Sequence, residues 1–315
     1  MLIKDKWLLI FVSFLAVVAI SICGGKVNAY FDNKARDDEF ELISKHLQSD
    51  DASAKPRLWI HSSSPTSSGI NALAMKSIVA RCSDFFTICV VRDDTFSQYI
   101  PAWNSDDKKN KFNSKKHIRE YGMVLLLYLY GGIVVPESFL CFRCLSSIYL
   151  TSAQAESPLL FGTPSCVENR LAVTNRPFLP DPRFIAAPKK NAIVHQMLHF
   201  ISGHKDTDQF SNSLQYWCLA QYKKNNILLF DGKQIGVKDS HNDAIMLENL
   251  MEEKELALQD GCLGIFIPYA EMQKRQKYQW FAALSEEATL GTSAILSKYL
   301  RFAKHTAAPS STPTL

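Results

Sequence analysis

The sequence feature that most constrains this chain is residues 117–138, HIREYGMVLLLYLYGGIVVPES. Every residue from Met123 to Tyr130 is apolar or aromatic, and a helix without a polar face is buried inside a domain. Gly131 and Gly132 follow, and glycine can adopt the positive φ that ends a helix. The stretch therefore predicts a buried helix that ends at a pair of glycines.

A short strand is expected directly after the glycines. Residues 133–135 are β-branched, which is typical of a buried strand. Pro136 cannot donate to a β-ladder, so the strand should stop there. Glu137 and Ser138 then fall just past its carboxyl end, where open α/β sheets bind ligands.

This pattern resembles the sugar-transferase family with a DXD motif, glycosyltransferase family 32. In that family a Ser-Asp pair opens a helix, an apolar turn follows, and Tyr-Gly-Gly leads into a strand that ends in Asp-x-Asp. Tyr130, Gly131 and Gly132 match this pattern, whereas Arg119 and Glu120 stand in the places of the Ser-Asp pair.

The sequence departs from the family at two further points. Met123 stands where the family usually has Arg, and Pro136-Glu137-Ser138 replaces the Asp-x-Asp motif. The resemblance implies a GT-A-like nucleotide-sugar transferase fold, a Rossmann-like mixed sheet flanked by helices. It also implies a donor site whose metal-binding motif is degenerate.

Hydrophobic periodicity predicts an α/β fold, because strands and helices alternate along the chain. The alternation begins with a strand at residues 57–61, a helix at 71–82 and a strand at 85–91. Later strands are expected at residues 159–162, 171–173, 183–188, 227–230, 234–237 and 263–267, and later helices at 192–201, 213–222, 243–256 and 285–302. Residues 175–182, NRPFLPDP, are expected to be irregular.

Residues 7–25 are uncharged and mostly apolar, and are just long enough to cross a bilayer as a transmembrane signal anchor. Lys4 and Lys6 favour a cytoplasmic N-terminus, hence a single-pass type II protein that faces the Golgi or ER lumen. The alternative is a signal peptide cleaved near Ala29, followed by secretion. The predicted segments are a cytoplasmic tail (1–6), the anchor (7–25), a stem (26–55), the glycosyltransferase-like domain (56–303) and a disordered tail (304–315).

Polar residues after the first two predicted strands are candidates for donor binding. His61 ends the first strand, and the resemblance places a family histidine there. Asp93 and Asp94 follow the second strand, where they either contact the nucleotide or simply form a solvated turn. The full set of predicted donor-binding residues is His61, Asp93, Asp94, Glu120, Gly131, Gly132 and Glu137.

A nucleotide-sugar transferase must neutralise the leaving diphosphate, and carboxylate oxygens suit Mn or Mg. Glu137 and His241 are the predicted metal residues, although His241 also fits an N-cap cluster at the start of a helix. A basic residue such as Arg119 or Arg143 is the alternative to the metal. The sequence indicates no catalytic base or nucleophile.

Two functions from different classes remain open. The first is a membrane-anchored transferase that moves a hexose from a nucleotide sugar to a glycan or glycoconjugate acceptor. The second is a catalytically inactive descendant that binds a glycan or a protein, and an unrelated anchored structural protein is a third possibility. The net charge of +4 is small and argues neither for nor against an anionic partner. No dense basic stripe is visible, so no nucleic-acid partner is expected.

Two short motifs have zinc-binding alternatives that we consider weaker than structural roles. Cys141 and Cys144 form a lone CxxC among 8 cysteines, and are expected to be half-buried strand residues. His195 and His199 are four residues apart on a predicted helix, but residue 196 is Gln, so the metalloprotease base is missing.

Overall fold

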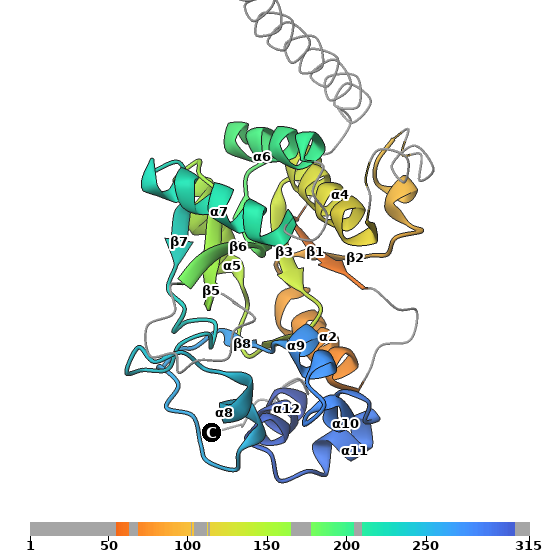
Figure 1. Ribbon diagram of the computed structural model, residues 1–315, viewed down its shortest axis with the longest axis vertical. Coiled ribbons are helices and arrows are strands. Elements are labelled where there is room, and N and C mark those ends of the chain that lie inside the picture. Colours follow the sequence, from red (N-terminus) through yellow and green to blue (C-terminus); the bar gives the residue numbers. More distant parts are fainter. Residues whose placement is uncertain are drawn as a thin grey trace, which may run out of the picture. The chain divides into compact units, whose positions relative to one another are not determined.

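The computed structural model describes residues 55–62, 69–101, 103, 112, 114–164, 178–204 and 210–305. They belong to one compact unit (Figure 1). The described strands are β1 (Arg57–His61), β2 (Thr87–Val91), β3 (Gly132–Pro136), β4 (Phe139–Cys141), β5 (Leu159–Pro164), β6 (Phe178–Ala187), β7 (Leu228–Phe230) and β8 (Gly264–Phe266). The described helices are α2 (Gly69–Cys82), η1 (Phe96–Gln98), α4 (Lys115–Tyr130), α5 (Ser146–Gln154), α6 (Ala192–Gly203), α7 (Phe210–Lys223), α8 (Leu247–Met251), α9 (Tyr269–Lys274), α10 (Gln279–Ala282), α11 (Glu286–Leu290) and α12 (Ile295–His305).

Six strands form one mixed sheet in the order β2-β1-β3-β6-β5-β7. β1 pairs in parallel with both β2 and β3, so the carboxyl ends of these three strands share one edge of the sheet, which we call the carboxyl edge. β6 is antiparallel to its neighbours β3 and β5, whereas β5 and β7 are parallel. β4 and β8 form a separate antiparallel pair. The α/β class and the mixed sheet predicted from the sequence are confirmed.

The central helix α4 and the strand β3 form as predicted, and glycines make their junction possible. Ser114 caps the start of α4, where its hydroxyl accepts a backbone N–H. Gly131 ends the helix with a φ of 69°, and the indole N–H of Trp59 donates to its carbonyl oxygen at 3.0 Å. Gly132 has a φ of 105°, and a Cβ there would lie 2.0 Å from the carbonyl oxygen of Arg57. The close approach of β1 to β3 therefore requires glycine at this position.

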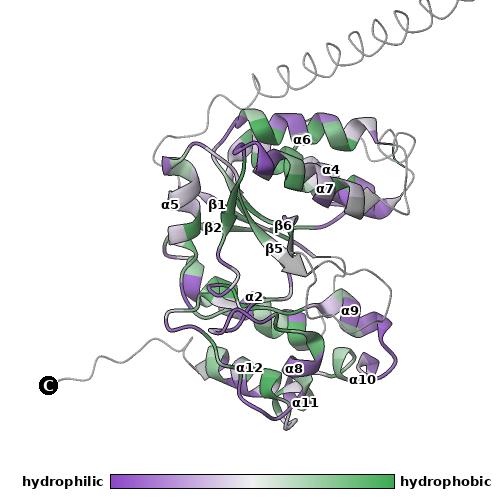
Figure 2. Cartoon of the chain, turned by 60° about the vertical axis from the view of Figure 1, so that its left-hand side comes forward, coloured by the Kyte–Doolittle hydropathy of each residue, from purple (hydrophilic) through white to green (hydrophobic). Residues whose placement is uncertain are grey.

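Helices cover both faces of the sheet (Figures 1 and 2). α4, α6 and α7 lie on one face, where α4 packs against α6 and α7 packs against β6. On the other face, Ile78 and Cys82 of α2 join the apolar core beneath the strands. Ile70 and Leu73 of the same helix join a second core formed with β4, β8 and the helices α8, α9, α10 and α12. α2 therefore lies between the sheet and the C-terminal helices.

Four of the predicted elements are wrong in extent or type. Residues 178–182 belong to β6, residues 234–237 form turns, the helix expected at 243–256 spans only 247–251, and the helix expected at 285–302 is divided into α11 and α12. The prolines of β6 are tolerated because β3 pairs only with residues 185–187, which leaves residues 178–182 next to β5 alone. Gly291 separates the last two helices.

Within the described part of the chain, no helix is both long enough and apolar enough to cross a bilayer. The predicted tail and anchor, residues 26–54 of the stem, the strand expected at 171–173 and residues 306–315 lie outside the described residues. α12 continues to His305, so the first two residues of the predicted C-terminal tail are helical.

Candidate functional site

Three of the predicted side chains lie at the carboxyl edge. His61 is the last residue of β1, and its register partners are Val91 and Pro136, which end β2 and β3. Asp93 follows β2 by two residues, and Glu137 follows β3 directly. The parallel pairing of these strands therefore brings together residues that are far apart in the sequence.

His61 and Asp93 form a direct contact. His61 Nε2 lies 2.8 Å from Asp93 Oδ1, and the imidazole stacks on Phe96 with the ring centroids 6.0 Å apart. Burial lowers the pKa of His61, although the hydrogen bond with Asp93 opposes this shift. The same hydrogen bond lowers the pKa of Asp93. At neutral pH the site thus holds an oriented, neutral imidazole beside a carboxylate that is about half exposed.

The residues of the altered motif are used by the protein itself. The hydroxyl of Ser62 donates to Glu137 Oε1 at 2.8 Å, so the loop after β1 is fixed to the end of β3. Ser138 is buried, and its hydroxyl donates to the carbonyl oxygen of Ile267 at 2.7 Å. Ser138 therefore connects the end of β3 to the C-terminal part of the unit and does not extend into the site.

Arg119 supplies a positive charge at the same edge. Because α4 leads directly into the start of β3, the first turns of α4 lie beside the carboxyl edge. Arg119 Nε is 3.8 Å from Asp93 Oδ1, and the side chain is 31% exposed. Among the described residues, this buried Nε has no hydrogen-bond partner. Arg119 therefore pairs with Asp93 by charge, without a hydrogen bond from its Nε–H to any of the described residues.

Glu120 and Lys116 lie on the side of α4 that faces β6. Burial raises the pKa of Glu120, and the nearby carboxylate of Asp181 raises it further. Burial likewise lowers the pKa of Lys116, against the attraction of Glu120. Glu120 is half-buried, and a desolvated carboxyl of this kind is typical of binding and catalytic sites, whereas Lys116 is exposed to solvent and gives no such indication.

The sequence analysis missed an ion pair on β6. Asp181 is 2% exposed and accepts hydrogen bonds from the backbone N–H and the Nε of Arg183, both at 2.9 Å, and from Gln215 Nε2 at 3.2 Å. The guanidinium of Arg183 is also 5.7 Å from the ring of Phe266. Asp181 and Arg183 are two residues apart, the spacing of one strand face, but they fall in and beside the proline-rich segment that was expected to be irregular.

Other predicted site residues lie elsewhere. Gly131 and Gly132 are at the amino end of β3, which places Gly132 about 16 Å from Glu137 at roughly 3.3 Å per strand residue. The exposed side chain of Asp94 pairs with Arg92, with Asp94 Oδ1 3.1 Å from Arg92 Nε. His241 is largely exposed on a turn beside Asp239. The structure does not bring these four residues into contact with the polar side chains at the carboxyl edge.

The residues at the carboxyl edge do not fit a Mn or Mg centre. These ions need several oxygen ligands on one centre. Glu137 is the one acidic residue of the altered motif, and its Oε1 already accepts the Ser62 hydroxyl. Across the residues that the structure describes, no group of three or more His, Cys, Asp or Glu side chains is arranged to hold a metal.

The two motifs with zinc alternatives also form pairs and not metal cages. His195 Nε2 and His199 Nε2 are 3.2 Å apart, and His195 stacks on Tyr128. Cys141 is a residue of β4 as expected but is fully buried and not half-buried, whereas Cys144 is partly exposed and lies beyond that strand. The prediction that both cysteines are strand residues is wrong for Cys144.

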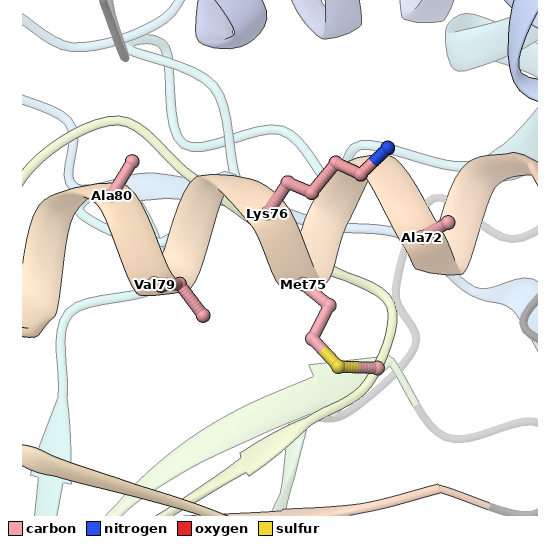
Figure 3. Close-up of a pocket in the computed structure, with 5 residues that line it drawn as sticks. All are labelled: Ala72, Met75, Lys76, Val79 and Ala80. Carbon is pink, nitrogen blue, oxygen red and sulfur yellow. The ribbon is translucent and has the colours of Figure 1, made fainter.

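An apolar hollow lies along α2, in contrast to the charged cluster at the carboxyl edge (Figure 3). It is lined by Ala72, Met75, Lys76, Val79 and Ala80. None of the predicted site residues lines it, and Lys76 is paired with Glu286. The charge of Lys76 is already engaged by Glu286, so the candidate functional site remains the cluster at the carboxyl edge.

The fold and the site define an α/β protein with a charged cluster at the carboxyl ends of three parallel strands. Comparison with known protein families gives no match, and neither does comparison with curated proteins. Among solved structures, the chain is similar to one named "PaToxG Glycosyltransferase", at 10% identity and a TM-score of 0.34, over 63% of this chain and 80% of that chain. A glycosyltransferase is thus a distant structural neighbour, and the α/β class rests on the sheet and helices of the chain itself.

Proposed function

We propose that this protein is a glycosyltransferase that transfers a hexose from a nucleotide sugar to a glycan or glycoconjugate acceptor. The observation that carries the proposal is the convergence of His61, Asp93, Arg119 and Glu137 at the carboxyl edge. Ligands of open α/β sheets bind at this edge. The resemblance of residues 117–138 to glycosyltransferase family 32 supports a nucleotide sugar as the ligand.

The charges of the site assign different parts of the donor to different residues. The carboxylate of Asp93, oriented by His61, is suited to accept hydrogen bonds from ribose hydroxyls. Arg119 is suited to the diphosphate, because a guanidinium binds phosphate oxygens through two parallel N–H donors. Since the carboxylates do not fit a metal, Arg119 is the group that would neutralise the leaving diphosphate.

The second candidate function is a catalytically inactive protein that binds a glycan or a partner protein. The hydrogen bond between Ser62 and Glu137 favours it, because the acidic residue left at the motif is engaged within the protein. The preserved helix-Gly-Gly-strand core does not distinguish the two functions, since the fold needs it in both.

A thermal unfolding experiment tests the proposal. Full-length protein is heated with UDP, GDP and their hexose conjugates, with and without Mn²⁺. A ligand at 100 times its Kd adds about 2.7 kcal/mol to the stability of the folded state. We expect one nucleotide sugar to raise the Tm equally with and without Mn²⁺.

Two arginine variants sharpen this experiment. Arg119→Gln should abolish the rise in Tm. Arg143→Gln is the matched control. Arg143 lies two residues after Cys141, whose sulfur contacts Cys82 at the end of α2, and this end of α2 lies away from the carboxyl edge. A rise that appears only with Mn²⁺ would contradict the role of Arg119. No rise with any nucleotide would favour the inactive binding protein, and hydrolysis or transfer of the sugar would exclude it.

We also propose that residues 7–25 anchor the chain as a type II protein with its domain in the ER or Golgi lumen. Protease protection of intact microsomes tests this orientation. A domain digested without detergent would contradict it. A secreted chain that begins near residue 30 would instead support cleavage near Ala29.

A further inference from the structure

Three cysteines that have no part in the proposed site come together on the face of the sheet that α2 covers. Cys82 is the last residue of α2, Cys141 is the last residue of β4, and Cys144 follows three residues later. Cys82 Sγ and Cys141 Sγ are 3.9 Å apart, and Cys144 lies close enough to Cys82 to lower the pKa of its thiol. In the part of the chain that the structure describes, all cysteines are unpaired thiols.

The elements that carry Cys82 and Cys141 are fixed to each other. The backbone N–H of Cys141 donates to Ser77 Oγ of α2 at 2.8 Å, and Ser77 Oγ donates to the carbonyl oxygen of Ala74 at 2.6 Å. A disulfide bond is about 2.05 Å long, so the two sulfurs need to approach by roughly 2 Å. Rotation about the Cα–Cβ bonds can supply this movement without a change in the packing of α2 against β4.

The three thiols differ in access and acidity. Cys82 and Cys141 are 0% exposed, whereas Cys144 is partly exposed. The hydrogen bonds from its neighbours lower the pKa of Cys82, and burial raises the pKa of Cys144. An oxidant in solution therefore reaches Cys144 first, and Cys82, which the other two thiols both influence, is the thiol placed for the next step.

We propose that Cys82, Cys141 and Cys144 form a thiol–disulfide exchange site that reacts with a small disulfide such as oxidised glutathione and ends with a disulfide bond between Cys82 and Cys141. This site is independent of the proposed sugar transfer. It joins the helix that follows β1 to the strand that follows β3, and these are two of the strands whose ends carry the candidate functional site.

The reaction has three exchange steps. The Cys144 thiolate attacks one sulfur of oxidised glutathione, and one glutathione thiolate leaves. The Cys82 thiolate attacks Cys144 and displaces the second glutathione thiolate, and the Cys141 thiolate then attacks Cys82 and releases Cys144. Two cysteine thiols are oxidised to one disulfide, one oxidised glutathione is reduced, and its two thiolates take up the two protons released.

The test is to oxidise reduced full-length protein with oxidised glutathione. Samples are quenched at intervals with acid and an alkylating agent, and the peptides are mapped by mass spectrometry. We expect glutathione on Cys144 early and a peptide linked through Cys82 and Cys141 at the end. This wild-type result tests the final disulfide without any variant, so it does not depend on whether a variant folds.

Three variants then test the order of the steps. Cys141→Ser should stop at a Cys82–Cys144 disulfide, and Cys144→Ser should form the same final bond at least about tenfold more slowly. Cys89→Ser is the matched control, because Cys89 is a buried thiol of β2 outside the cluster, and it should behave as wild type. The proposal is overturned if Cys82 and Cys141 stay alkylatable in wild type, if they pair with cysteines outside the cluster, or if Cys144→Ser reacts at the wild-type rate.

Discussion

Replacing Gly132 with alanine should destabilise the domain severely, although the change adds one methyl group. The first cost is conformational, because a φ of 105° is unfavourable for a residue with a Cβ. The second is steric, because the new Cβ would lie 2.0 Å from the carbonyl oxygen of Arg57 and 2.9 Å from its carbonyl carbon. These atoms are backbone, and moving them would disturb the pairing of Leu58 with Ile133. Together the two costs amount to about 4 kcal/mol.

Two other glycines separate these costs. Gly261 has a φ of 81° and nothing within 4 Å of the position that a Cβ would take, so Gly261→Ala carries only the conformational cost, about 1 kcal/mol. Gly291 has a φ of −83°, and its nearest contact would be an ordinary 3.6 Å, so Gly291→Ala should change the stability by less than about 0.5 kcal/mol.

Urea unfolding of the three alanine variants provides the measurement. The free energies of unfolding should fall in the order Gly291→Ala, Gly261→Ala, Gly132→Ala, with similar m values. A loss at Gly132 no larger than the loss at Gly261 would refute the steric argument. If Gly132→Ala kept full stability and lost only nucleotide binding, the donor-binding role predicted from the sequence would be right and the structural role wrong.

Three further predictions follow from the contacts described above. Burial lowers the pKa of His61 below 6.5, so the unfolded state binds a proton before the folded state does as the pH falls. The stabilising contribution of neutral His61 is therefore present above pH 6.5 and declines below it. His61→Gln should flatten the pH dependence of the urea midpoint between about pH 7 and pH 5. Asp181→Ala should cost about 2–3 kcal/mol in urea unfolding, because it removes the acceptor of several hydrogen bonds, whereas exposed Asp94→Ala should cause no measurable change. The disulfide between α2 and β4 would close a loop of about 60 residues, so oxidised protein should be more stable by about 4 kcal/mol and melt roughly 10 °C higher than reduced protein, and Cys82→Ser, which removes the cysteine common to both cross-links, should show no such difference.

The central helix and strand were predictable because their signals are local. The apolar run from residue 123 to residue 130 excludes a solvated face, and the two glycines mark the end of the helix without any knowledge of the rest of the chain. The reason that Gly132 must be glycine was not predictable. A side chain at residue 132 would collide with the carbonyl oxygen of Arg57, which belongs to another strand of the sheet.

The candidate site was predictable only where a residue follows a clear strand. His61, Asp93 and Glu137 met that condition, but their partners did not: Ser62 is 75 residues from Glu137 in the sequence, and no local pattern joins them. Asp181 was missed because three prolines in NRPFLPDP indicate a loop, and only the pairing of β6 with β5 makes that segment a strand. Long-range strand pairing overrode the local preference.

The two ends of β3 show why resemblance to the family does not by itself establish transferase activity in this protein. Gly131 and Gly132, which match the family pattern, lie at the amino end and serve the packing of β1 against β3. The motif that departs from the family lies at the carboxyl end, where Glu137 is bonded to Ser62 and the charge of Arg119 stands beside Asp93. Folding alone requires the glycines at the first end, so their match to the family does not distinguish an active transferase from an inactive one. Only the carboxyl end can decide the function, and there the decisive contrast is between nucleotide binding that depends on Arg119 and binding that depends on an added metal.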